Sequence, residues 1–142
     1  MKTNIKNILN GYHVNSKYWQ DWKINRPNLN PTLFQLCLGI VLSDASMYRV
    51  STHSYIKFEQ GKAQKDFLFH IFQIIKQYTF IETPGTRIDK DKIIKSFWFK
   101  TFSHPTFSNI YELFYKDIGL VRKKIISTNI IKNYLDKEGF SY

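Results

Sequence analysis

The residues of this sequence that could do chemistry are mainly cations. Lysine and arginine number 21 against 11 aspartates and glutamates, which gives a formal net charge of +10 and an isoelectric point near 9.7. Such an excess is typical of domains that contact nucleic-acid phosphates. It is spread along the chain, and only Arg122, Lys123 and Lys124 form a tight run. We therefore expect a broad binding face rather than a basic tail. The alternative is a protein that its charge merely keeps soluble.

Other reactive residue types are sparse. The single cysteine, Cys37, lies inside an apolar stretch and excludes both a disulfide framework and a cysteine-rich zinc module. The four histidines show no spacing typical of metal ligands. The acid that stands out is Asp44, which follows the apolar run 36–42 and Ser43. Taken alone, Asp44 is interpreted as a residue that caps the turn at the end of a helix.

The elements that must position these residues follow an α+β order. Asn30 and Pro31 are typical of a helix start. The helix that they open is apolar on nearly all sides, which predicts burial all round. Alternation then predicts a hairpin over 48–52 and 55–59. We expect a helix over 62–78, a second hairpin over 87–89 and 93–102, a helix from Pro105 to Gly119, a basic loop and a short helix over 128–135.

The domain organisation follows from these patterns. Residues 1–30 show no sustained period and are interpreted as an extended N-terminal arm with about one helical turn, whereas 31–142 form a single domain. No apolar run is long enough to span a bilayer, and no signal peptide is visible, so we expect no membrane partner. Seventeen of the 21 cations are lysine, and isoleucine and asparagine are frequent. This bias suggests an AT-rich genome such as an organelle's, and we expect a mitochondrial matrix protein.

Residues 38–45, Leu-Gly-Ile-Val-Leu-Ser-Asp-Ala, resemble the LAGLIDADG motif of homing endonucleases. The glycine, the small residues and the aspartate stand at the motif's spacings. Three further stretches extend the similarity in the order found in the first half of a single-chain family member of yeast mitochondria: Phe58-Glu59, residues 101–107, and Lys123-Lys124 through Asn133-Tyr134-Leu135. The resemblance covers residues 34–142.

The resemblance implies a LAGLIDADG-type αββαββα half-domain, with a curved antiparallel four-stranded sheet and helices on one face. It implies one subunit, the first half, of a split endonuclease that binds double-stranded DNA and cleaves it with Mg²⁺. Asp44 and Lys124 would be catalytic, and Asp44 would bind the metal together with Ser43. The second motif half is absent from this chain, so we expect a separately encoded half or a second copy as partner. The expected partner-helix interface comprises Leu38, Gly39, Leu42, Ser43 and Ala45.

The sheet is expected to contact the nucleic acid. If Ile56 and Phe58 face the helices, the residues that alternate with them face the major groove, where polar side chains read base edges. These are Tyr55, Lys57 and Glu59, with Arg49 and Ser51 on the neighbouring strand. The second hairpin and the basic run add Arg87, Lys90, Lys92, Lys95 and Lys123 as contacts to phosphates or bases.

A second function fits the same residues. The basic face could grip structured RNA through phosphates and 2′-hydroxyls. The chain would then be a nuclease-inactive RNA-binding protein derived from this fold, such as an intron maturase or a structural component of a mitochondrial ribosome. A plain protein-interaction module leaves the charge unexplained.

Overall fold

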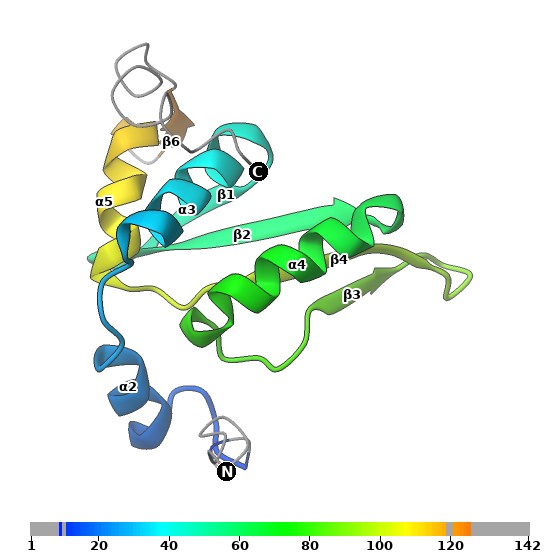
Figure 1. Cartoon of the computed structure of the whole chain (residues 1–142), viewed down its shortest axis with the longest axis horizontal. Helices are drawn as coiled ribbons and strands as arrows, with labels where there is room; N and C mark the ends of the chain where they lie inside the picture. The colour runs from blue at the N-terminus through cyan, green and yellow to red at the C-terminus, as the bar shows by residue number, and fades with distance from the viewer. Residues whose placement is uncertain (1–8, 10, 119–120, 126–142) are drawn as a thin grey trace. The chain divides into compact units, whose positions relative to one another are not determined.

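Figure 1 shows the computed structural model of the chain, which describes residues 9, 11–118 and 121–125. The described residues divide into two compact units. One, called here the β3–β4 unit, lies within Met1–Pro27 and Glu59–Phe102, and the other, the α3 unit, lies within Asn28–Phe58 and Ser103–Tyr142. No helix in these described ranges is long and apolar enough to cross a membrane.

Two antiparallel hairpins build the main sheet. Strand β1 (Ser46–Val50) pairs with β2 (His53–Gly61), and β3 (Gly85–Ile88) pairs with β4 (Ile94–Lys100). The four strands follow the order β1-β2-β4-β3 in one sheet. Together with the helices, this confirms the predicted α+β class and the four-stranded antiparallel sheet.

The α3 unit is organised around a buried helix. Helix α3 (Pro31–Ser43) begins as predicted, because the Asn30 side chain accepts a hydrogen bond from the Leu33 N–H at 2.8 Å and Pro31 occupies the first turn. It lies beside α5 (Pro105–Phe114), which packs on β1 (Figure 1). The core of this unit is apolar and includes Leu36, Leu38, Val41, Ile56, Phe58, Phe107 and Ile110.

The β3–β4 unit packs one amphipathic helix on a hairpin. Helix α4 (Lys65–Ile75) lies along β4 and is flanked by two short 3-10 helices, η1 (Lys62–Gln64) and η2 (Lys76–Tyr78) (Figure 1). The ring centroids of Phe72 and Phe99 are 5.5 Å apart, and those of Phe69 and Phe97 are 5.4 Å apart. Phe97 and Phe99 therefore mark the helix-covered face of β4, and the residues that alternate with them lie on the opposite face.

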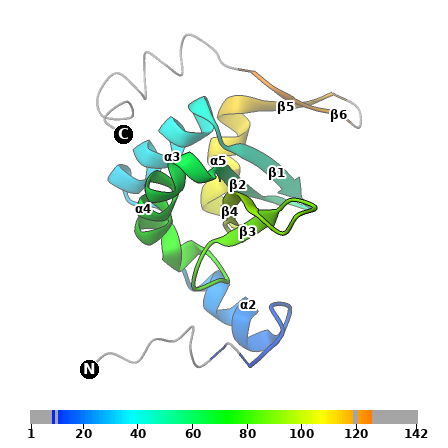
Figure 2. The same cartoon turned by 90° about the vertical axis from the view of Figure 1, so that its right-hand side faces the viewer.

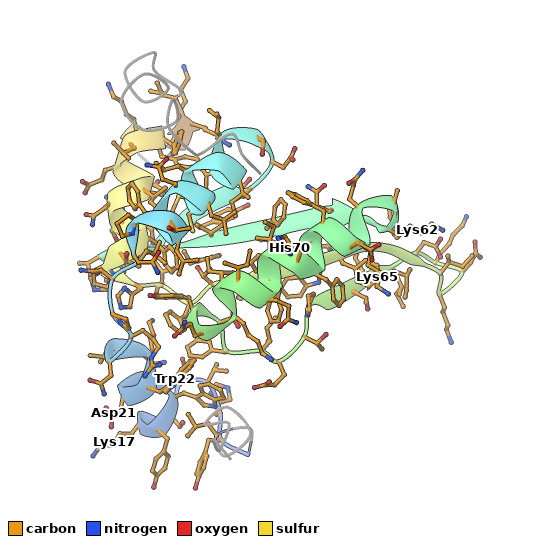
Figure 3. All side chains as sticks on the ribbon, in the orientation of Figure 1. Lys17, Asp21, Trp22, Lys62, Lys65 and His70 are labelled. Atoms are coloured by element: carbon orange, nitrogen blue, oxygen red, sulfur yellow. The ribbon has the colours of Figure 1, made fainter. Side chains whose placement is uncertain are left out.

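The N-terminal segment differs from the predicted extended arm. Residues Lys17–Ile24 form helix α2, which starts at Ser16, whose hydroxyl accepts from the Trp19 N–H at 3.4 Å. Trp19 and Trp22 are buried against Phe80 and Phe102, while Lys17 and Asp21 lie on the exposed side (Figure 3). Two aromatic anchors on a short polar helix give no sustained period, so tertiary burial stabilises a helix that the pattern does not indicate.

The region after α5 also differs from prediction. Helix α5 ends at Phe114 rather than Gly119, because Tyr115 adopts an extended conformation (φ −125°, ψ 146°). Strands β5 (Tyr115–Ile118) and β6 (Val121–Lys124) then pair as an antiparallel hairpin where a basic loop was expected (Figure 2). The helix predicted over 128–135 falls outside the described residues.

Candidate active site and nucleic-acid interface

Asp44 stands at the C-terminal end of α3. Its backbone N–H donates to the Ile40 carbonyl at 2.9 Å, and its side chain is exposed. Within the described ranges, no hydrogen bond or ion pair engages the Asp44 carboxylate. The side chain therefore does not cap the turn, which was the alternative interpretation from sequence. A carboxylate held at a helix end without a partner remains available to a ligand or a cation.

Lys124 lies at the same end of α3. Its ammonium group donates hydrogen bonds to the backbone carbonyls of Val41 and Ala45, the latter at 3.1 Å. These carbonyls belong to the helix end and to the turn that follows it, where backbone acceptors lack intrahelical partners and the helix dipole favours a cation. Strand β6 thus carries Lys124 to the turn that contains Asp44, and the ammonium itself is held by the backbone.

The oxygen donors around Asp44 are suited to part of a Mg²⁺ site. The Ser43 hydroxyl is engaged with the carbonyls of Gly39 and Ile40 at 3.2 and 3.3 Å, so its backbone carbonyl is the better metal ligand. Mg²⁺ accepts one or two carboxylates and completes its shell with water and phosphate oxygens. No group of three or more His, Cys, Asp or Glu side chains gathers anywhere in the described part of the chain. The residues fit a site that a second carboxylate from elsewhere completes.

The predicted partner-helix interface needs correction. Leu38 and Ala45 are 0% and 1% exposed, because both pack into the core of the α3 unit, and they are not available to a second helix. Gly39 and Leu42 are partly exposed and Ser43 is exposed. Helix α3 is therefore not buried all round. Its uncovered side follows helical spacing and comprises Thr32, Gln35, Gly39, Leu42 and Ser43.

The face of the β1–β2 hairpin carries a different set from the one expected. Ile56 and Phe58 are fully buried and Tyr55 and Lys57 are partly exposed, in agreement with the alternation. Arg49, however, pairs across the strands with Ser54, which is also fully buried. Directly paired residues share a face, so Arg49 lies on the side of Ile56 and the prediction for it is wrong.

The helix-facing side explains what Arg49 does. Its guanidinium lies 4.7 Å from the Tyr111 ring centroid and 3.9 Å from the Glu112 carboxylate, so it packs on α5. Ser51 lies in the tight turn with φ 57°, not on a strand. The hairpin turn occupies positions 51 and 52, inside the strand expected over 48–52, and the observed register pairs Arg49 with the buried Ser54. Tyr48, which stacks on Tyr55 at 5.4 Å, is the residue that sequence reasoning missed.

The predicted contact residues of the second hairpin separate into three groups. Arg87 pairs with the Glu59 carboxylate, and this hydrogen bond and charge raise the pKa of the guanidinium. Lys90 and Lys92 are exposed in the connection between β3 and β4. Lys95 is exposed on the face of Phe97, the side of α4. In the other unit, Lys123 is exposed on β6.

Two further residues of the β3–β4 unit were not singled out from sequence. Ser96 pairs directly with Arg87, and Trp98 pairs with Gly85. A Cβ on Gly85 would lie 2.8 Å from the Trp98 ring, so glycine allows the indole to lie flat on the neighbouring strand. Alternation from the buried Phe97 and Phe99 is the signal that would have placed Ser96 and Trp98 on the opposite face.

Cys37 and Lys65 are structural in this arrangement. Burial raises the pKa of the Cys37 thiol to about 12, as expected for an unreactive core residue. Lys65, at the start of α4 (Figure 3), lies 5.4 Å from the ring centroids of both Phe69 and Phe97. Its cation therefore covers aromatic surface on the helix-covered side.

Known proteins are similar to this chain in sequence and in fold. A sequence profile of the LAGLIDADG DNA endonuclease family matches residues 34–142. The probable intron-encoded DNA endonuclease 3 of Mycosarcoma maydis is 48% identical over 52 residues, which cover 37% of this chain and 38% of that protein. In fold, the chain resembles the homing endonuclease I-WcaI, solved bound to its DNA recognition sequence. The TM-score is 0.73 at 24% identity, over 92% of this chain and 57% of that one.

The family profile covers the region that carries Asp44. The profile match begins inside α3 and includes both hairpins, α4 and α5. The chain spans little more than half of the solved endonuclease, and its match to the fungal relative covers a smaller share. The extent of the profile match decides the assignment: the chain belongs to the LAGLIDADG DNA endonuclease family.

Proposed function

We propose that this chain binds double-stranded DNA and cleaves it with Mg²⁺ once a second LAGLIDADG helix is paired with α3. The observation that carries the proposal is the exposed Asp44 carboxylate, which engages no other side chain or backbone group in the described ranges. An unpaired carboxylate beside a basic surface contributes little to the stability of the fold. It is a good ligand for a hard cation that also binds phosphate.

The second helix is required by the composition of the site. Asp44 is the one carboxylate at the end of α3 in the described structure, and Mg²⁺-dependent cleavage of two strands needs acidic ligands for both. The uncovered side of α3 presents Gly39, Leu42 and Ser43, which are small or apolar and permit close helix contact. We favour a separately encoded LAGLIDADG half as the partner over a second copy of this chain.

Each residue at the site has a distinct task in this proposal. Asp44 and the Ser43 carbonyl would hold Mg²⁺, which when bound polarises the scissile phosphate and lowers the pKa of a water ligand. Lys124 fixes the carbonyls of Val41 and Ala45 and so holds the turn that presents Asp44. Its positive charge would also offset the negative charge that develops on the phosphate.

Cleavage of the DNA that the assembly selects tests the proposal. The purified chain, with its copurifying partner, is incubated with that DNA and Mg²⁺, and each strand is followed separately. Asp44→Asn should abolish cleavage of at least one strand while leaving Mg²⁺-independent binding intact, because the amide has the same volume without the charge. Full cleavage of both strands by this variant would refute the catalytic assignment.

One observation favours a second candidate, a nuclease-inactive RNA-binding protein such as an intron maturase or a mitochondrial ribosome component. The Lys124 ammonium is already engaged by two backbone carbonyls, as expected if it is structural. The charge of +10 suits RNA phosphates as well as DNA phosphates. Tighter binding to structured RNA than to duplex DNA, with no cleavage, would favour this function.

The compartment follows from the same reasoning. The fungal relative is named as intron-encoded, and the lysine-, isoleucine- and asparagine-rich composition suits an AT-rich genome. We propose the mitochondrial matrix, and fractionation of cells that express the native chain tests this.

A further inference from the structure

Three polar side chains meet on the open face of the β3–β4 unit. The Glu59 carboxylate accepts hydrogen bonds from Arg87 Nε at 3.0 Å and from Arg87 Nη2 at 3.1 Å. The Ser96 hydroxyl donates to the same carboxylate at 2.6 Å. Ser96 is 7% exposed and pairs directly with Arg87 across the strands. The buried hydroxyl thus fixes the carboxylate, and the carboxylate fixes the guanidinium.

The pairing leaves one edge of the guanidinium available. A guanidinium has five N–H donors in a fixed plane, and Glu59 takes the edge formed by Nε and Nη2. The other edge, formed by Nη1 and Nη2, carries two parallel N–H groups. No residue in the described ranges accepts from Nη1, and the Arg87 side chain is 51% exposed. This free edge has the geometry that pairs with O6 and N7 of guanine.

The Glu59 carboxylate beside Arg87 favours a base over a phosphate as the ligand of the free edge. A phosphate bound at the free edge would lie on the other side of the Arg87 guanidinium from the Glu59 carboxylate. The two negative charges would repel each other, and this repulsion would weaken the binding of the phosphate to Arg87. A guanine edge is neutral and offers two acceptors, so Glu59 does not repel it. The pair also restricts the rotamers of Arg87 before binding, which lowers the entropic cost of a bidentate contact.

We propose that Arg87 reads a guanine in the major groove and that Glu59, held by Ser96, is the positioning residue for it. The inference rests on the proposed DNA binding and adds a base identity to it. Lys90, exposed in the connection between β3 and β4, forms no ion pair in the described ranges although Asp89 and Asp91 flank it in sequence, and it serves here as the phosphate-type comparison.

Selection from a random DNA duplex pool tests the assignment. The full chain, in the assembly that it forms, is used to enrich bound sequences, and the relative affinity of each base at each position is then measured by competition. The wild-type protein should prefer guanine at one position by about 5- to 140-fold, the range for a good bidentate contact. Arg87→Ala should remove the preference at that position alone.

Two conservative variants separate positioning from stability. Glu59→Gln keeps the side-chain volume and Ser96→Ala removes a single hydroxyl, and both should reduce the guanine preference to below about 5-fold while the thermal midpoint stays near that of the wild type. Lys90→Ala should instead weaken binding to all sequences equally. It should also reduce the slope of log affinity against log salt concentration by about one, because one phosphate contact is lost. The matched contrast lies in base preference, which a purely structural ion pair would not change.

Each result has a definite meaning. An unchanged guanine preference in Glu59→Gln and Ser96→Ala overturns the positioning role, and an unchanged preference in Arg87→Ala overturns the base assignment. In both cases the wild-type protein still enriches DNA, so the proposed function stands. If the wild-type assembly enriches no DNA at all, the proposed function fails and this inference fails with it.

Discussion

Replacing Lys124 by Met tests whether strand β6 holds the end of α3. Met keeps an apolar stem of similar length but removes the ammonium that donates to the carbonyls of Val41 and Ala45. A hydrogen bond that involves a charged group contributes about 1.5 to 3 kcal/mol. Lys124 is partly exposed, so water compensates in part, and we assign that range to both bonds together rather than to each.

The expected change is a lower midpoint of thermal unfolding. For a domain of this size, 1 kcal/mol corresponds to about 3 to 4 °C, so Lys124→Met should lower the midpoint by about 4 to 12 °C. Circular dichroism at 222 nm, with urea unfolding as a second measurement, follows the transition. Lys124→Arg should recover most of the loss, because the guanidinium can still donate to backbone carbonyls.

The neighbouring lysine is the matched control. Lys123 is exposed and lies opposite Lys116 in the β5–β6 register, so Lys123→Met removes a repulsive pair. We expect its midpoint to equal or slightly exceed that of the wild type. Asp44→Ala should also change stability by less than about 0.5 kcal/mol, because its carboxylate caps nothing in the described structure. Equal midpoints for Lys124→Met and Lys123→Met would refute the proposed role of Lys124.

Three further outcomes are expected. Asn30→Ala should destabilise the protein by about 1 kcal/mol in urea unfolding, because it removes the acceptor for the Leu33 N–H, and retention of full stability would contradict this. Gly85→Ala should displace the Trp98 ring, which is visible in near-ultraviolet circular dichroism, whereas Thr86→Ala on the adjacent exposed position should leave the spectrum unchanged. If about six to ten cations contact phosphates, DNA affinity should fall by about 10³ to 10⁵ between 50 and 200 mM salt, and a flat dependence would exclude the basic face as the binding surface.

The helix that carries Asp44 could be predicted because several local signals agree. Asn30 and Pro31 mark its start, the apolar run gives its length, and the period changes after Asp44. The class and the main sheet followed from the same patterns. Helix α2 could not be found in this way, since its stability comes from packing Trp19 and Trp22 on residues distant in sequence.

The faces of the first hairpin were harder to assign than its existence. A two-residue turn at Ser51 requires a positive φ, for which glycine or asparagine is the usual signal, and serine gives no such indication. The strand expected over 48–52 therefore included the turn, and Arg49 was assigned to the face opposite to the one that it occupies. The contacts of Lys124 and the Glu59–Arg87–Ser96 cluster join residues far apart in sequence, which spacing alone cannot bring together.

The burial of Cys37 makes the protein its own probe of conformational opening. This thiol is the only one in the chain, it is fully buried in α3, and its raised pKa leaves almost no thiolate while the helix stays packed. A thiol reagent can therefore react only when the α3 unit opens, so the labelling rate measures the free energy of that opening without any added label. A second helix that packs on the uncovered side of α3 should slow the labelling of Cys37. The labelling rate of this one thiol therefore reports whether the partner is bound.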